Sequence, residues 1–129
     1  MKKFLGIDYG AKRIGLAIAD DQANIARPYK TVAAGELEAV IASEGPFDAV
    51  VVGLPRALSG GDTAQTLAVR RAADDLLWRK LHIEPVFQDE AGTSGVAEDR
   101  LRQAGKPYDK AAVDAEAASI ILQDYLDAL

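Results

Sequence analysis

The most constraining feature of the sequence is a pair of apolar runs, residues 3–8 and 14–19, separated by only five residues. Each run is long enough for a short buried β-strand. The turn between them, Tyr9–Lys12, contains Gly10, which is free to adopt a positive φ. Strands joined by so short a connection pair antiparallel, because a parallel pair needs a crossover of a dozen or more residues. We therefore expect the chain to begin with a β-hairpin.

After the hairpin, the pattern changes from strands to alternating helices and strands. A third strand is expected over residues 25–32, and Pro28 weakens it or places it at a sheet edge. The clearest buried strand is Ala49–Gly53. The other expected elements are a helix over 35–43, a loop over 54–61, a helix from Asp62 or Thr63 to about Leu81, a strand over 84–88, and helices over 94–103 and 111–126. This order predicts an α/β fold with a mixed five-stranded sheet, antiparallel hairpin strands first and parallel βαβ units second, flanked by helices.

The length of 129 residues fits one domain spanning residues 1–129. The absence of cysteine excludes disulfides, zinc–thiolate sites and thiol nucleophiles. The N-terminus begins like a signal peptide, but Asp8 interrupts its apolar run, and no segment could span a membrane. We therefore expect a cytoplasmic protein with no membrane association. Trp78 and Phe87 are expected in its core rather than as base-stacking platforms.

The charge distribution is uneven along the chain. A formal net charge of −5 argues against broad, non-specific binding to a polyanion. However, residues 1–30 carry six Lys/Arg against three Asp/Glu, whereas the remaining residues carry nine against seventeen. The N-terminal part could face a phosphate backbone, or the basic stretch could be ordinary surface scatter.

Three carboxylates stand where they could converge. Asp8 ends the first strand, Glu90 ends the last strand, and Asp114 lies in the first turn of the final helix. If the first and fourth strands are neighbours, these side chains meet in a cleft at the strand ends, where ligand sites of open α/β sheets tend to lie. Converging carboxylates raise one another's pKa, and a divalent cation relieves the repulsion. Oxygen ligands alone favour Mg²⁺ or Mn²⁺, and one or two such ions would support phosphodiester hydrolysis.

Each of these carboxylates also has a plainer interpretation. Asp8 could simply end a strand or begin a turn, as aspartates often do. Glu90 and Asp114 could be acidic residues in the first turn of a helix, where they interact favourably with its dipole. The pattern alone leaves both interpretations open.

Four blocks of the sequence resemble one known family. Leu5–Ala17 is similar to the opening of the YqgF family, whose members are called pre-16S rRNA nucleases or Holliday junction resolvase-like proteins. The other matching blocks, in the family's order, are Ala26–Pro28, Val51–Pro55 followed by Ser59–Gly60 and a long helix, and Val113–Leu122. The resemblance covers nearly the whole chain, and the first and last blocks together make it fairly specific.

The resemblance implies an RNase H-like fold and divalent-metal-dependent phosphodiester hydrolysis, with Asp8, Glu90 and Asp114 as the catalytic and metal-binding residues. It implies precursor 16S rRNA as the substrate, and precursor ribosomal particles as partners during ribosome biogenesis. The alternative is that the same chemistry cleaves Holliday junctions in DNA. Structured RNA is preferred here over branched DNA, although the sequence does not separate the two polymers.

The chain departs from the family's pattern after Glu90. The family usually has Asp-Glu-Arg-Leu there, whereas this sequence has Asp89-Glu90 followed by Ala91-Gly92. The missing arginine removes a bidentate contact to phosphate or carboxylate. Either another cation replaces it, or activity on the usual substrate is weakened.

Further candidates for contact with nucleic acid are Lys12, Arg13, Arg56 and Ser59. Lys12 and Arg13 lie in the hairpin turn beside Asp8, where they could meet a phosphate or remain solvated turn charges. Arg56 and Ser59 belong to the loop after the central strand, which could line a substrate channel or be a plain surface loop.

Two other function classes remain open at this stage. Gly6–Gly10 also resembles the first phosphate loop of the actin, sugar kinase and Hsp70 group, which needs two such domains around a nucleotide. Alternatively, the chain could be a non-catalytic protein of the same fold that binds RNA or the ribosome, as the missing arginine and the acidic balance suggest.

Overall fold

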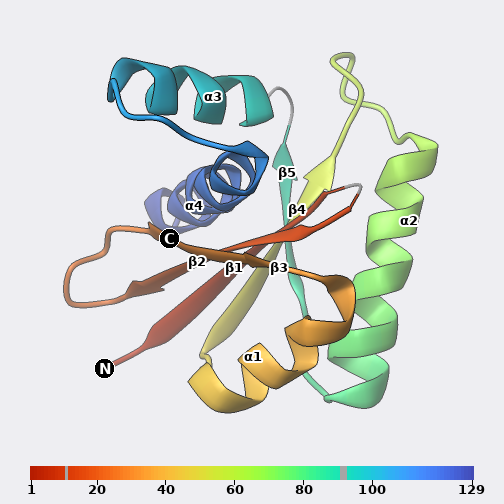
Figure 1. Ribbon diagram of the computed structural model, residues 1–129. Helices are drawn as coiled ribbons and strands as arrows, with labels where there is room; N and C mark the ends of the chain where they lie inside the picture. The colour runs from red at the N-terminus through yellow and green to blue at the C-terminus, as the bar shows by residue number, and fades with distance from the viewer. Residues whose placement is uncertain (11, 91–92) are drawn as a thin grey trace.

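The computed structural model describes residues 1–10, 12–90 and 93–129. Within these ranges, five strands form one sheet in the order β3-β2-β1-β4-β5, with helices on both faces (Figure 1). The strands are β1 (Lys3–Tyr9), β2 (Ile14–Asp20), β3 (Arg27–Val32), β4 (Ala49–Pro55) and β5 (Val86–Glu90). This arrangement confirms the predicted α/β fold with a mixed five-stranded sheet.

The pairing of the strands follows the short and long connections in the sequence. β1 and β2 form the predicted antiparallel hairpin, and β3 pairs antiparallel with β2 at the sheet edge, where Pro28 is tolerated. β1 and β4 are parallel neighbours, as are β4 and β5. Gly10 does not use its freedom to adopt a positive φ. Glycine is needed there for space, since a Cβ would lie 2.7 Å from the Arg13 carbonyl oxygen.

The helices differ from the predicted ones mainly at their ends. They are η1 (Ala34–Glu36), α1 (Leu37–Glu44), α2 (Ala64–Ala73), η2 (Asp74–Lys80), α3 (Thr93–Gln103) and α4 (Lys110–Asp127). The predicted helix ending near Leu81 is therefore two segments, α2 and the π-helical η2. Thr63, one of the two expected caps, caps α2 by accepting a hydrogen bond from the Thr66 backbone N–H. The last strand begins at Val86 rather than Glu84, because Pro85 has no N–H to donate to the ladder.

The core has two layers because successive side chains of a strand point to opposite faces of the sheet. On one face, Leu5 and Ile7 of β1 pack with α1, α2 and η2, and on the other Phe4 packs with α4. Figure 1 shows α4 crossing one face of the sheet, with α3 lying outside it, and α1 and α2 on the opposite side. Trp78 was expected in the core, but it is exposed because it lies on the outer side of η2. Phe87 is partly buried, as expected, and packs against the core.

None of the helices in the described part of the chain is both long and apolar enough to cross a bilayer.

Candidate active site

Asp8 lies on the α4 face of the sheet because it has the same parity along β1 as Phe4 and Gly6. It is buried near the end of the strand, with 8% of its surface exposed. Figure 1 shows α4 running across this face of the sheet. A carboxylate in this position is removed from most of the solvent and needs partners that offset its loss of hydration.

Glu90 reaches Asp8 across the strand that separates them. β4 lies between β1 and β5, so the two acidic residues belong to strands about 10 Å apart. The intervening position on β4 is Gly53, where a Cβ would lie 3.1 Å from Glu90 Oε1 and 2.5 Å from Ile121 Cδ1. The absence of a side chain at Gly53 therefore leaves the room in which the two carboxyl groups meet, and they share a side-chain hydrogen bond.

Asp114 is brought to the same place by the first turn of α4. The helix begins after Asp109, whose side chain accepts a hydrogen bond from the Ala112 backbone N–H. It approaches β2 closely at Gly15, where a Cβ would lie only 2.0 Å from the Asp114 carbonyl oxygen. Gly15 pairs with Asp8 in the hairpin, so the close helix–strand contact sets the first turn of α4 directly beside Asp8.

The pKa values of the two touching carboxyl groups are raised. Burial and the negative charge of Asp114 raise the pKa of Asp8 to about 6, although Glu90 and Lys110 oppose this shift. Burial and the charge of Asp8 raise the pKa of Glu90 to about 7, and a hydrogen bond with Thr93 opposes the shift. Near pH 6 the pair therefore retains a proton that two exposed carboxylates would have lost.

The third carboxylate has a cationic partner. Asp114 is 6% exposed, and the Lys110 Nζ lies 3.5 Å from its Oδ1, one helical turn away. Across residues 1–10, 12–90 and 93–129, no three Asp, Glu or His side chains stand close enough together to hold a metal ion as they lie. In this arrangement, the ammonium beside Asp114 balances part of the acidic charge, and the raised pKa values of Asp8 and Glu90 favour their protonated forms.

A cleft of about 580 Å³ opens over these groups. The three carboxylates line it together with the side chains of four basic residues, so acidic and basic groups face the same space. The basic residues are Lys12, Arg13, Arg56 and Lys110. The cleft is large enough for a small polar ligand or a phosphodiester unit, and its basic rim suits an anionic one.

The structure places the four predicted nucleic-acid contacts in two groups. Lys12 and Arg13 are exposed at the hairpin turn, and Arg56 is partly buried after β4; all three line the cleft. Ser59 is exposed in the loop beyond and is not part of the cleft lining. The departure from the family pattern at Ala91 and Gly92 lies outside the described residues.

Several residues of the site were not singled out from the sequence. Gly15 and Gly53 are isolated glycines inside strand patterns, which is a recognisable signal of close backbone approach. Lys110 lies four residues before Asp114, a spacing that places both on one helix face. The contact between Thr93 and Glu90 had no comparable signal, because it depends on how α3 meets the end of β5.

Sequence comparison places the chain among known proteins. A family model described as "RuvX: Holliday junction resolvase" matches residues 2–128. A protein of Chloroflexus aggregans named "Putative pre-16S rRNA nuclease" is 44% identical over 132 residues, which cover 96% of this chain and 92% of that protein. A protein of the same name from Maridesulfovibrio salexigens is 40% identical, with coverage of 96% and 97%.

Structural comparison gives the fold class. RuvC of T. thermophilus, solved in complex with a Holliday junction substrate, superposes with a TM-score of 0.57 at 18% identity and covers 99% of this chain and 95% of its own. The yeast mitochondrial Holliday junction resolvase Ydc2 superposes with a TM-score of 0.56 at 10% identity, covering 97% and 78%. Identities this low support the fold alone, which is RNase H-like, as the sequence resemblance implied. The family model and the relatives together show that the chain belongs to the RuvX family, the YqgF family to which its sequence blocks are similar.

Proposed function

We propose that this protein is a divalent-metal-dependent nuclease that hydrolyses phosphodiester bonds in structured nucleic acid. The observation that carries the proposal is one cleft lined by Asp8, Glu90 and Asp114, which come from three different elements, under a basic rim. Buried acidic groups with raised pKa values in a cleft are typical of functional sites. Family membership independently favours a nuclease.

The chemistry of the donor set fits a hard divalent cation. All three side chains offer carboxylate oxygens, and the chain has no cysteine, so Mg²⁺ or Mn²⁺ suits the site better than a thiophilic metal. Asp8, Glu90 and Asp114 would hold the ion, which would replace the proton shared by the first two residues and the ammonium beside the third. Lys110 and the cation therefore compete for Asp114.

The residues of the cleft have different roles in the proposed reaction. Asp8 and Glu90 lose their proton as the pH rises through about 6 to 7, which prepares the site for a cation. Lys12 and Arg13 stand at the rim, where they can hold the phosphates of a nucleic acid against the cleft. When bound, a divalent cation supplies activation of a water and neutralisation of the developing negative charge in phosphodiester hydrolysis.

For the substrate, we propose precursor 16S rRNA, after the name carried by the relatives that are 40% and 44% identical. In this role the protein would meet precursor ribosomal particles in the cytoplasm. A Holliday junction in DNA is the second candidate, favoured by the description of the family model. Both polymers present the same phosphate backbone, so the cleft accommodates either.

The test is cleavage of a precursor-16S rRNA fragment and of a four-way DNA junction, each with Mn²⁺, with Mg²⁺ and with EDTA. Wild type is compared with Asp8→Asn and with Asp124→Asn, a matched change of an exposed carboxylate on α4. We expect wild type and Asp124→Asn to cut the RNA in the presence of either metal, and Asp8→Asn to leave it intact.

Each of the other outcomes has a distinct meaning. Cleavage of the junction alone would assign the resolvase activity. Equal cleavage by wild type and Asp8→Asn would mean that the observed activity comes from a contaminant. Binding of either polymer without cleavage would overturn the enzymatic proposal in favour of a non-catalytic role in nucleic-acid binding.

A further inference from the structure

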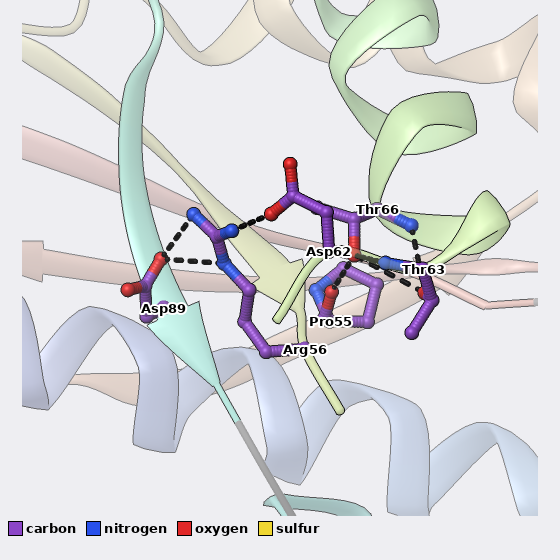
Figure 2. A network of polar contacts seen from close by, with 6 residues as sticks. All are labelled: Pro55, Arg56, Asp62, Thr63, Thr66 and Asp89. Atoms are coloured by element: carbon purple, nitrogen blue, oxygen red, sulfur yellow. Dashed lines mark hydrogen bonds and ion pairs between the residues drawn. The ribbon is translucent and has the colours of Figure 1, made fainter. Parts of the chain in front are cut away.

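Arg56 lines the cleft, and its guanidinium already forms ion pairs with two carboxylates. Figure 2 shows its guanidinium between Asp89 on one side and Asp62 on the other. The Nε and Nη2 atoms each lie 3.1 Å from Asp89 Oδ1, and Nη1 contacts Asp62 Oδ1. Three of the five guanidinium N–H groups are therefore directed at the two carboxylates, which leaves two for another acceptor.

Asp89 makes more contacts with the guanidinium than Asp62 does. Asp89 belongs to β5 and accepts from two guanidinium nitrogens, and the Arg56 backbone N–H donates to the Glu90 carbonyl oxygen at 3.1 Å. Asp62 contacts only one nitrogen and belongs to the connection between β4 and α2, immediately before the cap residue Thr63. The side chain of Asp62 can therefore turn away without disturbing the sheet.

The connection around Asp62 is closed by its own hydrogen bonds. The Ala57 N–H donates to the Gly61 carbonyl oxygen at 3.0 Å, and the Gly60 N–H donates to the Ala57 carbonyl oxygen at 2.7 Å. The Thr66 hydroxyl donates to the Pro55 carbonyl oxygen, which fixes the start of α2 to the end of β4 (Figure 2). Losing the contact between Arg56 and Asp62 therefore leaves the loop and the helix cap in place.

The Arg56 side chain is also less exposed than those of its two partners. The Arg56 side chain is 19% exposed, whereas those of Asp62 and Asp89 are 46% and 70% exposed. Ion pairs with such exposed carboxylates are weak, because water screens them. A phosphate offers a guanidinium a stronger, bidentate contact. The Asp62 contact is therefore replaceable by a phosphate that arrives in the cleft.

We propose that Asp62 is a built-in competitor for the Arg56 guanidinium, and that a backbone phosphate of the substrate displaces it while Asp89 keeps the guanidinium in place. This inference rests on the proposed function in one respect, namely that the ligand of the cleft is a nucleic acid. It adds a residue that sets affinity: Asp62 weakens the binding of a polyanion that contacts Arg56, because a phosphate must first displace it. Arg56 is then the phosphate contact and Asp62 its regulator.

The test is a double-mutant cycle on binding, measured in EDTA so that cleavage is not needed. The probes are the precursor-16S rRNA fragment and the four-way DNA junction, titrated at several salt concentrations. The variants are Asp62→Asn, Arg56→Gln, the double variant, and Asp75→Asn as a control that removes the same charge from an exposed position of η2. The melting temperature of each variant verifies that it is folded.

We expect Asp62→Asn to tighten binding of at least one probe roughly two- to five-fold, which is the range of an exposed ion pair. Asp75→Asn should leave affinity unchanged, and Arg56→Gln should weaken binding and lower the salt dependence by about one phosphate contact. In the Arg56→Gln background, Asp62→Asn should give no gain. A gain that persists without Arg56 would overturn the proposal, because it would come from general charge repulsion, and so would no gain at all.

Failure of this inference is distinguishable from failure of the proposed function. If the protein cuts RNA but Asp62→Asn leaves affinity unchanged, the nuclease proposal stands and the competitor is ruled out. If the protein binds without cutting and the gain still requires Arg56, the competitor stands and the nuclease proposal falls. If neither wild type nor Asp62→Asn binds either polymer, the competitor is ruled out for nucleic acids.

Discussion

Replacing Asp8 with asparagine should abolish cleavage and at the same time stabilise the metal-free protein. Asp8 is buried beside two other carboxyl groups, and its pKa rises from 3.8 to about 6 on folding. The charged form of Asp8 is thus disfavoured in the folded protein. An asparagine has nearly the same shape, can donate a hydrogen bond to Glu90, and carries no charge.

The magnitude follows from the shift. A rise in the pKa of Asp8 from 3.8 to about 6 lowers the free energy of unfolding of the wild type by roughly 3 kcal/mol at any pH above both values. Between these two pKa values the folded protein binds more protons than the unfolded chain, so wild-type stability falls as the pH rises through this window. The advantage of Asp8→Asn should therefore be largest at pH 8 and shrink towards pH 4.

The assay is urea denaturation in EDTA at a series of pH values between 4 and 8, for wild type, Asp8→Asn and the exposed control Asp124→Asn. At pH 8 we expect Asp8→Asn to be more stable by about 1–3 kcal/mol, or roughly 4–10 °C in melting temperature for a chain of this length. Millimolar Mg²⁺ should stabilise wild type and narrow the gap. A destabilised Asp8→Asn, or a gap that does not change with pH, would refute the electrostatic reasoning.

Three further predictions concern residues that surround the three carboxylates or support the loop beside them. Gly15→Ala would place a Cβ 2.0 Å from the Asp114 carbonyl oxygen, so it should cost at least about 3 kcal/mol of stability and abolish cleavage; a folded, active variant contradicts the close contact. Lys110→Gln should tighten Mg²⁺ binding in calorimetry, because the ammonium no longer competes for Asp114; weaker binding contradicts that role. Thr66→Val should lose about 1–3 kcal/mol in urea denaturation, because the Pro55 carbonyl oxygen loses its donor, while cleavage remains; unchanged stability contradicts this.

The sheet could be predicted because its determinants are local. The short connection through Gly10 forces a hairpin, and the apolar run at Ala49–Gly53 marks a strand that the structure extends to Pro55. Helix ends were predicted to within a few residues where a cap residue such as Thr63 is present. The division between α2 and η2 was missed, because nothing in the sequence pattern marks a change from α- to π-helical bonding at Asp74.

The site was only partly predictable because its geometry depends on the register of the paired strands and on how closely α4 packs against them. Strand ends indicated that Asp8 and Glu90 lie at the same edge, but their contact requires the empty position at Gly53 on the strand between them. Asp114 was placed in the first turn of its helix, but the closeness of that turn to β2 depends on Gly15. The sequence pattern marks Gly15 as a strand residue and Gly53 as the end of a strand, and it does not show what each of them packs against.

The engagement of Arg56 could not be predicted for the same reason. Its partners Asp62 and Asp89 are 6 and 33 positions away, and they meet only when β5 pairs in register with β4. Ser59 was grouped with Arg56 because both belong to one loop. The turn that closes between Ala57 and Gly61 leaves Ser59 exposed outside the cleft.

The most direct measurement of the central claim is a crystal structure of the protein soaked with Mn²⁺, with the ion located by its anomalous scattering. The account predicts a peak in the cleft with oxygen ligands from Asp8, Glu90 and Asp114, and with Lys110 displaced from Asp114. A Mn²⁺ ion bound elsewhere while these three carboxylates keep their metal-free arrangement would contradict it.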